Sequence, residues 1–194
     1  MGGSDFAGES LGAFLDELAS REPAPGGGAA AAVAAGLAAG LVGMAARFSG
    51  AELADAPQVA EEADRLRRAA LVLAGQDADA YRAVLAAFRR PKDSTDRSEG
   101  IRRALEQAAD VPLAVAEVAA RAATLAARLA GDGNRNLQGD ATVAVLLADA
   151  AARGAGELVE LNVTLGRLEG PWRERSAAHV ATTADAVLAL AGRR

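Results

Sequence analysis

The fold depends most on one segment, Pro25-Gly26-Gly27-Gly28 followed by the alanine-rich run from Ala29 to Phe48. The run is uncharged as far as Ala46, and three glycines recur in it at spacings of four and three: Gly36, Gly40 and Gly43. These spacings place the glycines along one side of a helix, where the missing side chains let other backbones approach closely. The stretch therefore predicts the central helix of an all-helical domain.

The glycines before this helix have a second interpretation. Pro25 and the triple glycine predict a non-helical entry, so the first N–H groups of the helix lack intrahelical acceptors and point outward. Such a helix start favours anions. Gly26, Gly27 and Gly28 are therefore candidate ligand-binding residues, and the alternative is that they serve close packing alone.

A membrane span and a signal peptide are two further interpretations of the same run. Its length is close to the roughly 20 residues that a span requires. Alanine and glycine are only weakly apolar, however, and no aromatic belt flanks the run. The preceding segment carries five acidic residues, the wrong charge for a signal peptide: Asp5, Glu9, Asp16, Glu17 and Glu22. We interpret the run as a core helix and take the cytoplasm as the default location.

The composition limits the classes of function. The 194 residues fit one domain, and 51% of them are hydrophobic although only 3% are aromatic. This composition favours closely spaced helices of Ala, Leu and Val and predicts no strand. A net charge of −5 with dispersed basic residues argues against nucleic-acid binding. No cysteine and a single histidine argue against a zinc site.

Breaks in the pattern divide the chain into about six helices, which predicts a single up-and-down bundle over residues 10–194 after a flexible start at residues 1–9. Asp55 is expected to cap a long helix that runs to about Arg90, and Asp140 a later one. Pro112 falls inside another predicted helix, where it should bend the helix and free the carbonyl of Ala108.

Asp77 is the most informative single residue. The long helix has an apolar stripe whose steps alternate between four and three, and Asp77 occupies a position on it; the other members are Val59, Ala63, Leu66, Ala70, Leu73, Ala80 or Tyr81, Val84 and Phe88. A buried carboxylate must be paired, hydrogen-bonded or protonated, because burying an unpaired charge is very costly. The position predicts either an arginine partner on another helix or an acid/base group that lines a pocket.

Six short motifs together resemble one family, that of formiminotetrahydrofolate cyclodeaminase and methenyltetrahydrofolate cyclohydrolase. In chain order they are Pro25-Gly26-Gly27-Gly28, Asp77-Ala78-Asp79-Ala80-Tyr81, Arg90-Pro91-Lys92, Val111-Pro112, Gly133-Asn134 and Asp140. The resemblance extends from about Ser10 to Leu190. It implies an all-helical homodimer that acts on one-carbon forms of tetrahydrofolate without a metal or cofactor. No nucleic acid or membrane partner is expected.

The resemblance also implies roles for particular residues. Asp77 matches the family's proposed proton donor, and Tyr81 belongs to the same pattern. The N–H groups of Gly26, Gly27 and Gly28 are candidates for the glutamate tail of the folate, as are Arg90 and Lys92. The remaining candidates for substrate binding are Asn134, Asp140 and Asn162. For Arg90 and Lys92 a solvated helix end is the alternative, and for Asp140 a plain N-cap.

The chain departs from the family pattern at three positions. Ala29 and Gly139 stand where serine is common, and Leu158 replaces the first of two asparagines, so that only Asn162 remains. Both cyclohydrolase and cyclodeaminase activity need the same pocket. The absence of a formiminotransferase domain favours the cyclohydrolase. The alternatives are a non-catalytic helical dimer that binds a folate or another small anion, and a structural dimerisation protein.

Overall fold

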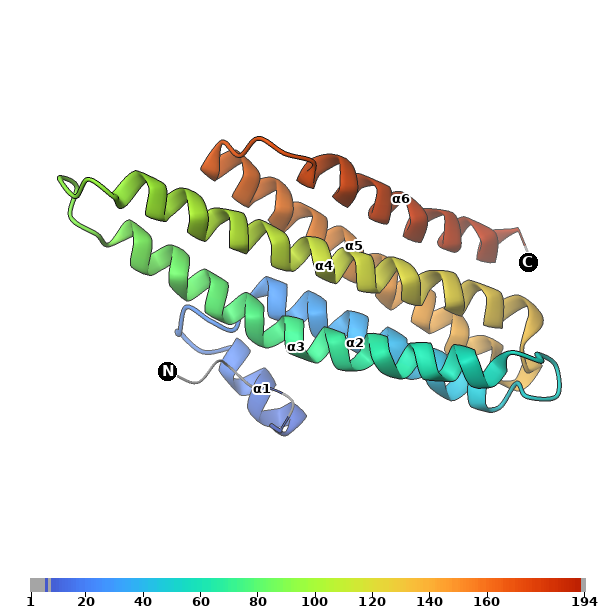
Figure 1. The fold of residues 1–194 in the computed structure, drawn as a ribbon. Helices are drawn as coiled ribbons and strands as arrows, with labels where there is room; N and C mark the ends of the chain where they lie inside the picture. Colours follow the sequence, from blue (N-terminus) through green and yellow to red (C-terminus); the bar gives the residue numbers. More distant parts are fainter. Residues whose placement is uncertain (1–5, 7, 193–194) are drawn as a thin grey trace.

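The structure is a computed structural model that describes residue 6 and residues 8–192, and this part of the chain is all-α without a strand (Figure 1). This confirms the predicted fold class. The helices are α1 (Leu11–Leu18), α2 (Gly27–Arg47), α3 (Ala56–Phe88), α4 (Arg97–Asp132), α5 (Gln138–Gly166) and α6 (Trp172–Ala191), with a short 3-10 helix, η1 (Arg135–Leu137), before α5.

Helix α2 packs against α3, α4 and α5, and twelve of its 21 residues are buried (Figure 1). Its glycines lie against α3: a Cβ added to Gly36 would be 3.4 Å from the Cβ of Ala70, and one added to Gly43 would be 3.5 Å from that of Ala63. Helix α2 is long and apolar enough to cross a membrane, but 56% of its most apolar window is buried inside the bundle. This burial is typical of a core helix.

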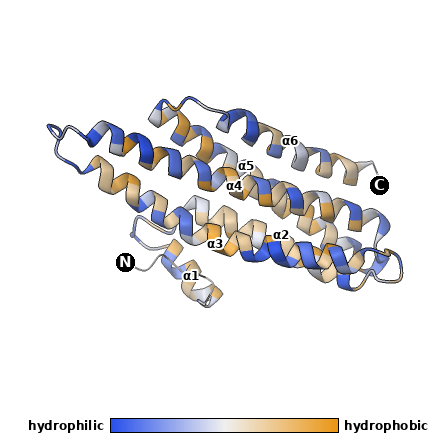
Figure 2. Cartoon of the chain, viewed as in Figure 1, coloured by the Kyte–Doolittle hydropathy of each residue, from blue (hydrophilic) through white to orange (hydrophobic). Residues whose placement is uncertain are grey.

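The hydrophilic residues gather on the outer faces of α3 and α4, whereas α2 behind them is mostly apolar (Figure 2). At one end of the bundle, α3, α4 and α5 extend past the first residue of α2 (Figure 1). This end has its own small core, to which α3 contributes Val84, α4 contributes Leu105 and α5 contributes Val159. The start of α2 therefore lies between longer helices.

Two predicted helix caps differ from the structure. Asp55 stands at the N-cap position of α3, but its carboxylate accepts two hydrogen bonds from Arg128, at 2.6 and 2.7 Å, and caps nothing. Asp140 lies in the first turn of α5, which begins at Gln138. In the first case a charged partner on α4 replaces the backbone N–H groups that an isolated helix would offer.

The segment before α2 closes one side of the bundle. Phe6 is buried and meets Phe14 of α1 edge to face, with 5.4 Å between ring centroids. The flexible start predicted for residues 1–9 lies largely outside the described residues, which omit 1–5 and 7.

Candidate active site

A pocket of about 360 Å³ lies at the start of α2. Four helices and the segment that precedes α2 form its walls: Pro23, Ala24, Gly26, Gly27 and Gly28; Asp77, Ala80 and Tyr81 of α3; Ala108 of α4; and Leu158, Leu161 and Asn162 of α5. Six of the predicted site residues thus share one pocket: the three glycines, Asp77, Tyr81 and Asn162. Their roles in binding or catalysis stay predictions.

Asp77 is the single charged residue among those that line this pocket. It is partly buried, and its carboxylate accepts a hydrogen bond from the backbone N–H of Ala29 in the first turn of α2. Burial raises the pKa of the Asp77 carboxyl, and the Ala29 hydrogen bond opposes that shift only in part. No arginine or lysine of the described chain pairs with it. The structure therefore favours the pocket-lining interpretation of Asp77 over the arginine-paired one.

Gly28 allows this contact between α2 and α3. A Cβ at position 28 would overlap the carboxyl group of Asp77. The third glycine of the triplet is thus required for close packing beside a carboxylate. Gly28 therefore fits both interpretations of the glycines, because it serves close packing and also lines the pocket. The sequence predicted that an anion of the ligand would bind the free N–H groups at the start of α2. In the structure one of these groups, the N–H of Ala29, donates a hydrogen bond to the carboxylate of Asp77.

The other walls of the pocket are mostly apolar. Tyr81 is 45% exposed, and Leu161, on the α5 side, is 63% exposed. Leu158, one of the three departures from the family pattern, contributes an apolar side chain where an asparagine is common. Such a surface suits a flat aromatic ring system better than a small ion.

Asn162 bridges two helices at the pocket wall. Its Nδ2 donates to the carbonyl oxygen of Ala108 on α4 at 2.7 Å and to that of Leu158 on α5 at 2.9 Å. Pro112, four residues after Ala108, lies inside α4 and provides no N–H. The prediction that Pro112 frees the Ala108 carbonyl is therefore confirmed, and Asn162 supplies the missing donor.

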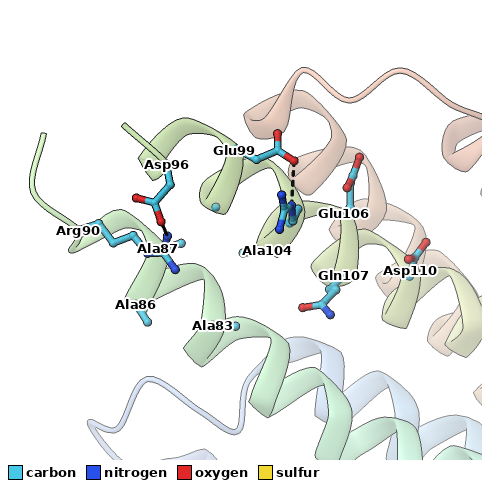
Figure 3. Close-up of a pocket in the computed structure, with 12 residues that line it drawn as sticks. Ala83, Ala86, Ala87, Arg90, Asp96, Glu99, Ala104, Glu106, Gln107 and Asp110 are labelled. Carbon is cyan, nitrogen blue, oxygen red and sulfur yellow. Dashed lines mark hydrogen bonds and ion pairs between the residues drawn. The ribbon is translucent and has the colours of Figure 1, made fainter. Parts of the chain in front are cut away.

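Arg90 and Lys92 lie away from this pocket. Arg90 lines a separate groove of about 710 Å³ between α3 and α4, where it donates to Asp96 at 2.8 Å (Figure 3). Charged side chains of both signs line that groove, and Glu99 there accepts from Arg103 at 2.8 Å (Figure 3). Lys92 is an exposed residue of the α3–α4 connection. Within one chain, neither cation faces Asp77.

Asn134 and Asp140 lie near the opposite end of α2. Asn134 donates through Nδ2 to the carbonyl oxygen of Phe48 at 2.9 Å, just after the last residue of α2. Because α2 has 21 residues, this end is about 30 Å from the helix start. One chain by itself therefore does not bring Asn134 or Asp140 to the pocket beside Asp77.

The pocket offers no metal site. The described part of the chain holds no group of three or more His, Asp or Glu residues that could bind a metal ion. Six residues that line the pocket were not among the predicted site residues: Pro23, Ala24, Ala80, Ala108, Leu158 and Leu161. Ala80 belongs to the motif that contains Asp77 and Tyr81, and Ala108 is marked by its place four residues before Pro112, but an apolar side chain in so apolar a sequence does not by itself indicate a pocket.

These features are those of an all-α protein with a small-molecule pocket, formed where a glycine-rich helix start meets a partly buried aspartate. The sequence profile described as Formiminotransferase-cyclodeaminase matches residues 10–168, and the chain belongs to that family.

Two relatives place the chain within the family. A methenyltetrahydrofolate cyclohydrolase of Methylorubrum extorquens is 38% identical over 164 residues, 79% of each protein. The crystal structure of formiminotetrahydrofolate cyclodeaminase from Thermotoga maritima superposes with a TM-score of 0.78 at 27% identity, covering 93% of this chain and 90% of that one.

Proposed function

We propose that this protein is a methenyltetrahydrofolate cyclohydrolase, which converts 5,10-methenyltetrahydrofolate and water into 10-formyltetrahydrofolate in the cytoplasm. The observation that carries the proposal is the lone carboxylate of Asp77 in a pocket with otherwise uncharged walls. The substrate is a cation whose charge is shared by N5, the bridging carbon and N10. A single anion among apolar walls complements this charge, and the cyclohydrolase relative supports the same reaction.

Asp77 acts first as a base and then as an acid in this reaction. The oxygen of water attacks the bridging carbon, and one of its protons passes to the carboxylate of Asp77. The carbon–N5 bond then breaks and its electron pair goes to N5, which takes the proton from Asp77. The hydroxyl proton of the intermediate leaves to solvent as the formyl C=O forms on N10. The reaction releases one proton overall and needs no metal or cofactor.

The cyclodeaminase reaction is the second candidate, favoured by the structural neighbour. In that reaction N10 attacks the formimino carbon, the bond from this carbon to the leaving nitrogen breaks, and Asp77 gives that nitrogen its proton. A carboxyl whose pKa is raised by burial suits this role as well as the first.

Hydrolysis of 5,10-methenyltetrahydrofolate, followed by its absorbance, tests the proposal. The rate should fall as the pH drops through the pKa of Asp77, because the base must be ionised. Since burial raises this pKa, the acid limb should lie above the range of an ordinary aspartate. Enzyme-free controls correct for spontaneous opening of the ring.

No acceleration with this substrate, but release of ammonia from the formimino form, would assign the cyclodeaminase reaction instead. Binding of folate without either turnover would favour a non-catalytic binding protein. Ala29 and Leu158 favour that alternative, because the family pattern has polar side chains at both positions: Leu158 lines the pocket, and Ala29 contacts Asp77 through its backbone N–H only.

We further propose that the protein is a homodimer joined along α2 and α5. Both helices present apolar residues to the outside, among them Leu37 of α2 and Leu161 of α5. The exposed side of α2 as far as Met44 carries no charge, and the apolar stripe of α5 continues through Val143, Leu147, Gly154 and Leu165. Exposed apolar faces of this length are typical of subunit interfaces.

Replacement of Leu37 by arginine should convert the dimer to a monomer, because it places a charge in the middle of the proposed interface. Light scattering at micromolar concentration should give about twice the chain mass of 19.5 kDa for the wild type and one chain mass for Leu37→Arg. Leu188→Arg on α6, at a leucine that is 68% exposed, is the matched control and should stay dimeric. A monomeric wild type would contradict the proposal.

An antiparallel pairing along this face would give Asn134 and Asp140 a place at the pocket. The apolar stripe runs from the pocket at Leu161 to the far end of α5, beside Asp140. In a two-fold pair of this kind, the far end of one copy lies beside the pocket of the other. The Asn134–Asp140 segment of a second copy would then approach the folate bound near Asp77.

A further inference from the structure

The hydrogen bonds of Asn162 determine which way its amide group faces. Both of its protein partners are carbonyl oxygens, those of Ala108 and Leu158, so only the NH₂ group can point toward them. A half-turn of the amide would bring its oxygen against two other oxygens. The Oδ1 atom is consequently held on the side of the amide that faces away from these two carbonyl oxygens, and Asn162 lines the pocket.

Pro112 is the reason that the Ala108 carbonyl needs this donor. In an uninterrupted helix the N–H of residue 112 would bond to the carbonyl of residue 108, and proline has no such N–H. Pro112 is fully buried inside α4, and the donor that reaches the Ala108 carbonyl, Asn162, is 54 positions further along the chain than Ala108. The proline of one helix thus orients the asparagine of another.

Asn162 therefore adds an amide oxygen to a pocket that is also lined by the carboxylate of Asp77 and the phenol of Tyr81. Among the described residues, no side chain or backbone group donates to this Oδ1. A bound ligand with N–H groups would satisfy it, and the exposed Leu161 beside it in the pocket wall suits the face of a ring.

We propose that Asn162 accepts a hydrogen bond from an N–H group of the ring system of the bound folate, and that Pro112 is a positioning residue that acts through Asn162. This inference rests on the proposed function, because it takes a folate as the ligand. The pterin ring carries N–H donors at its edge. The contact is made in the bound substrate as well as in the transition state, so it affects binding more than turnover.

A double-mutant cycle of Pro112→Ala and Asn162→Ala tests the proposal. Asn162→Ala should raise the KM for 5,10-methenyltetrahydrofolate, and the Kd for tetrahydrofolate by calorimetry, about 10-fold with little change in kcat. Pro112→Ala restores an N–H for the Ala108 carbonyl and so releases the amide of Asn162. It should raise KM and Kd several-fold although Asn162 is still present, and the double variant should bind no more weakly than Asn162→Ala alone.

Thermal unfolding provides a second readout that is independent of folate. Asn162→Ala should lower the unfolding midpoint, because the Ala108 carbonyl loses its donor, and Pro112→Ala in that background should restore it. Gln107→Ala removes an exposed amide of α4 that faces the outer groove between α3 and α4, outside the Asp77 pocket; it is the control and should change neither readout.

Unchanged KM and Kd in both single variants would overturn the role in binding, even if the unfolding midpoints are coupled. If the two substitutions shift the unfolding midpoint independently, so that the shift of the double variant is the sum of the two single shifts, the link between Pro112 and Asn162 is overturned. A wild type that binds no folate and turns over none would reject the proposed function, whereas the coupling of the midpoints would still report on the pair.

Discussion

Asp77→Asn is expected to lower the rate of 5,10-methenyltetrahydrofolate hydrolysis by about 10²- to 10⁴-fold, the usual contribution of a positioned acid/base group. The amide keeps the shape of the carboxyl group and can still accept from the N–H of Ala29, but it cannot take a proton from water. The effect should appear in kcat, because the proton is transferred only in the reaction. An unchanged kcat would remove Asp77 from the mechanism.

The stability of the Asp77→Asn variant separates lost chemistry from lost folding. Burial raises the pKa of Asp77 in the folded state, so the ionised carboxylate destabilises the wild type at neutral pH. The variant should therefore unfold at no lower temperature than the wild type at pH 7. The difference should shrink as the pH falls through this raised pKa and should vanish below the ordinary aspartate value of about 4, because the wild-type group is then protonated in both the folded and the unfolded state.

Asp79→Asn is the matched control for this experiment. Asp79 lies two residues further along α3, where it forms an exposed ion pair with Arg82 at 2.9 Å. The same chemical change is made there on the same helix but outside the pocket. We expect Asp79→Asn to keep wild-type kcat and the wild-type acid limb of the pH profile.

Gly28→Ala is expected to produce the second large effect, a loss of about 10²-fold in activity together with about 1–3 kcal/mol of stability. The added Cβ would overlap the carboxyl group of Asp77, so either this side chain or the start of α2 must move. Both displacements change the position of the acid/base group relative to the substrate. Activity and unfolding of the purified variant measure the two effects.

A second substitution shows whether the overlap with Asp77 is the cause. In an Asp77→Ala background the carboxyl group is absent, and Gly28→Ala should then cost little stability. Gly40→Ala, in the same helix, is the control, since its new Cβ would come no closer than 3.9 Å to Arg67. We expect this control to keep activity and to gain about 0.5–1 kcal/mol. An equal loss of stability in the presence and absence of Asp77 would contradict the argument.

Helical periodicity explains why part of the site could be predicted. Asp77 lies on the apolar stripe of α3, and this local pattern correctly placed it on an inward face. The same arithmetic does not extend to Arg90, because α3 ends at Phe88 and Arg90 lies in the connection that follows. There it lines the outer groove between α3 and α4 and pairs with Asp96. The direction of a residue outside a helix depends on the connection and its partners, which periodicity does not describe.

Composition and local periodicity are enough to predict the all-α class, the burial of α2 and the inward face of Asp77, because these two properties control helix formation and burial. Three other relations appear only in the folded chain: Gly28 abuts Asp77, Asn162 donates to the Ala108 carbonyl that Pro112 leaves without a donor, and Asn134 lies about 30 Å from the start of α2. These relations depend on which helix ends meet. That choice is made by the packing of whole helices, which no local pattern along the chain encodes.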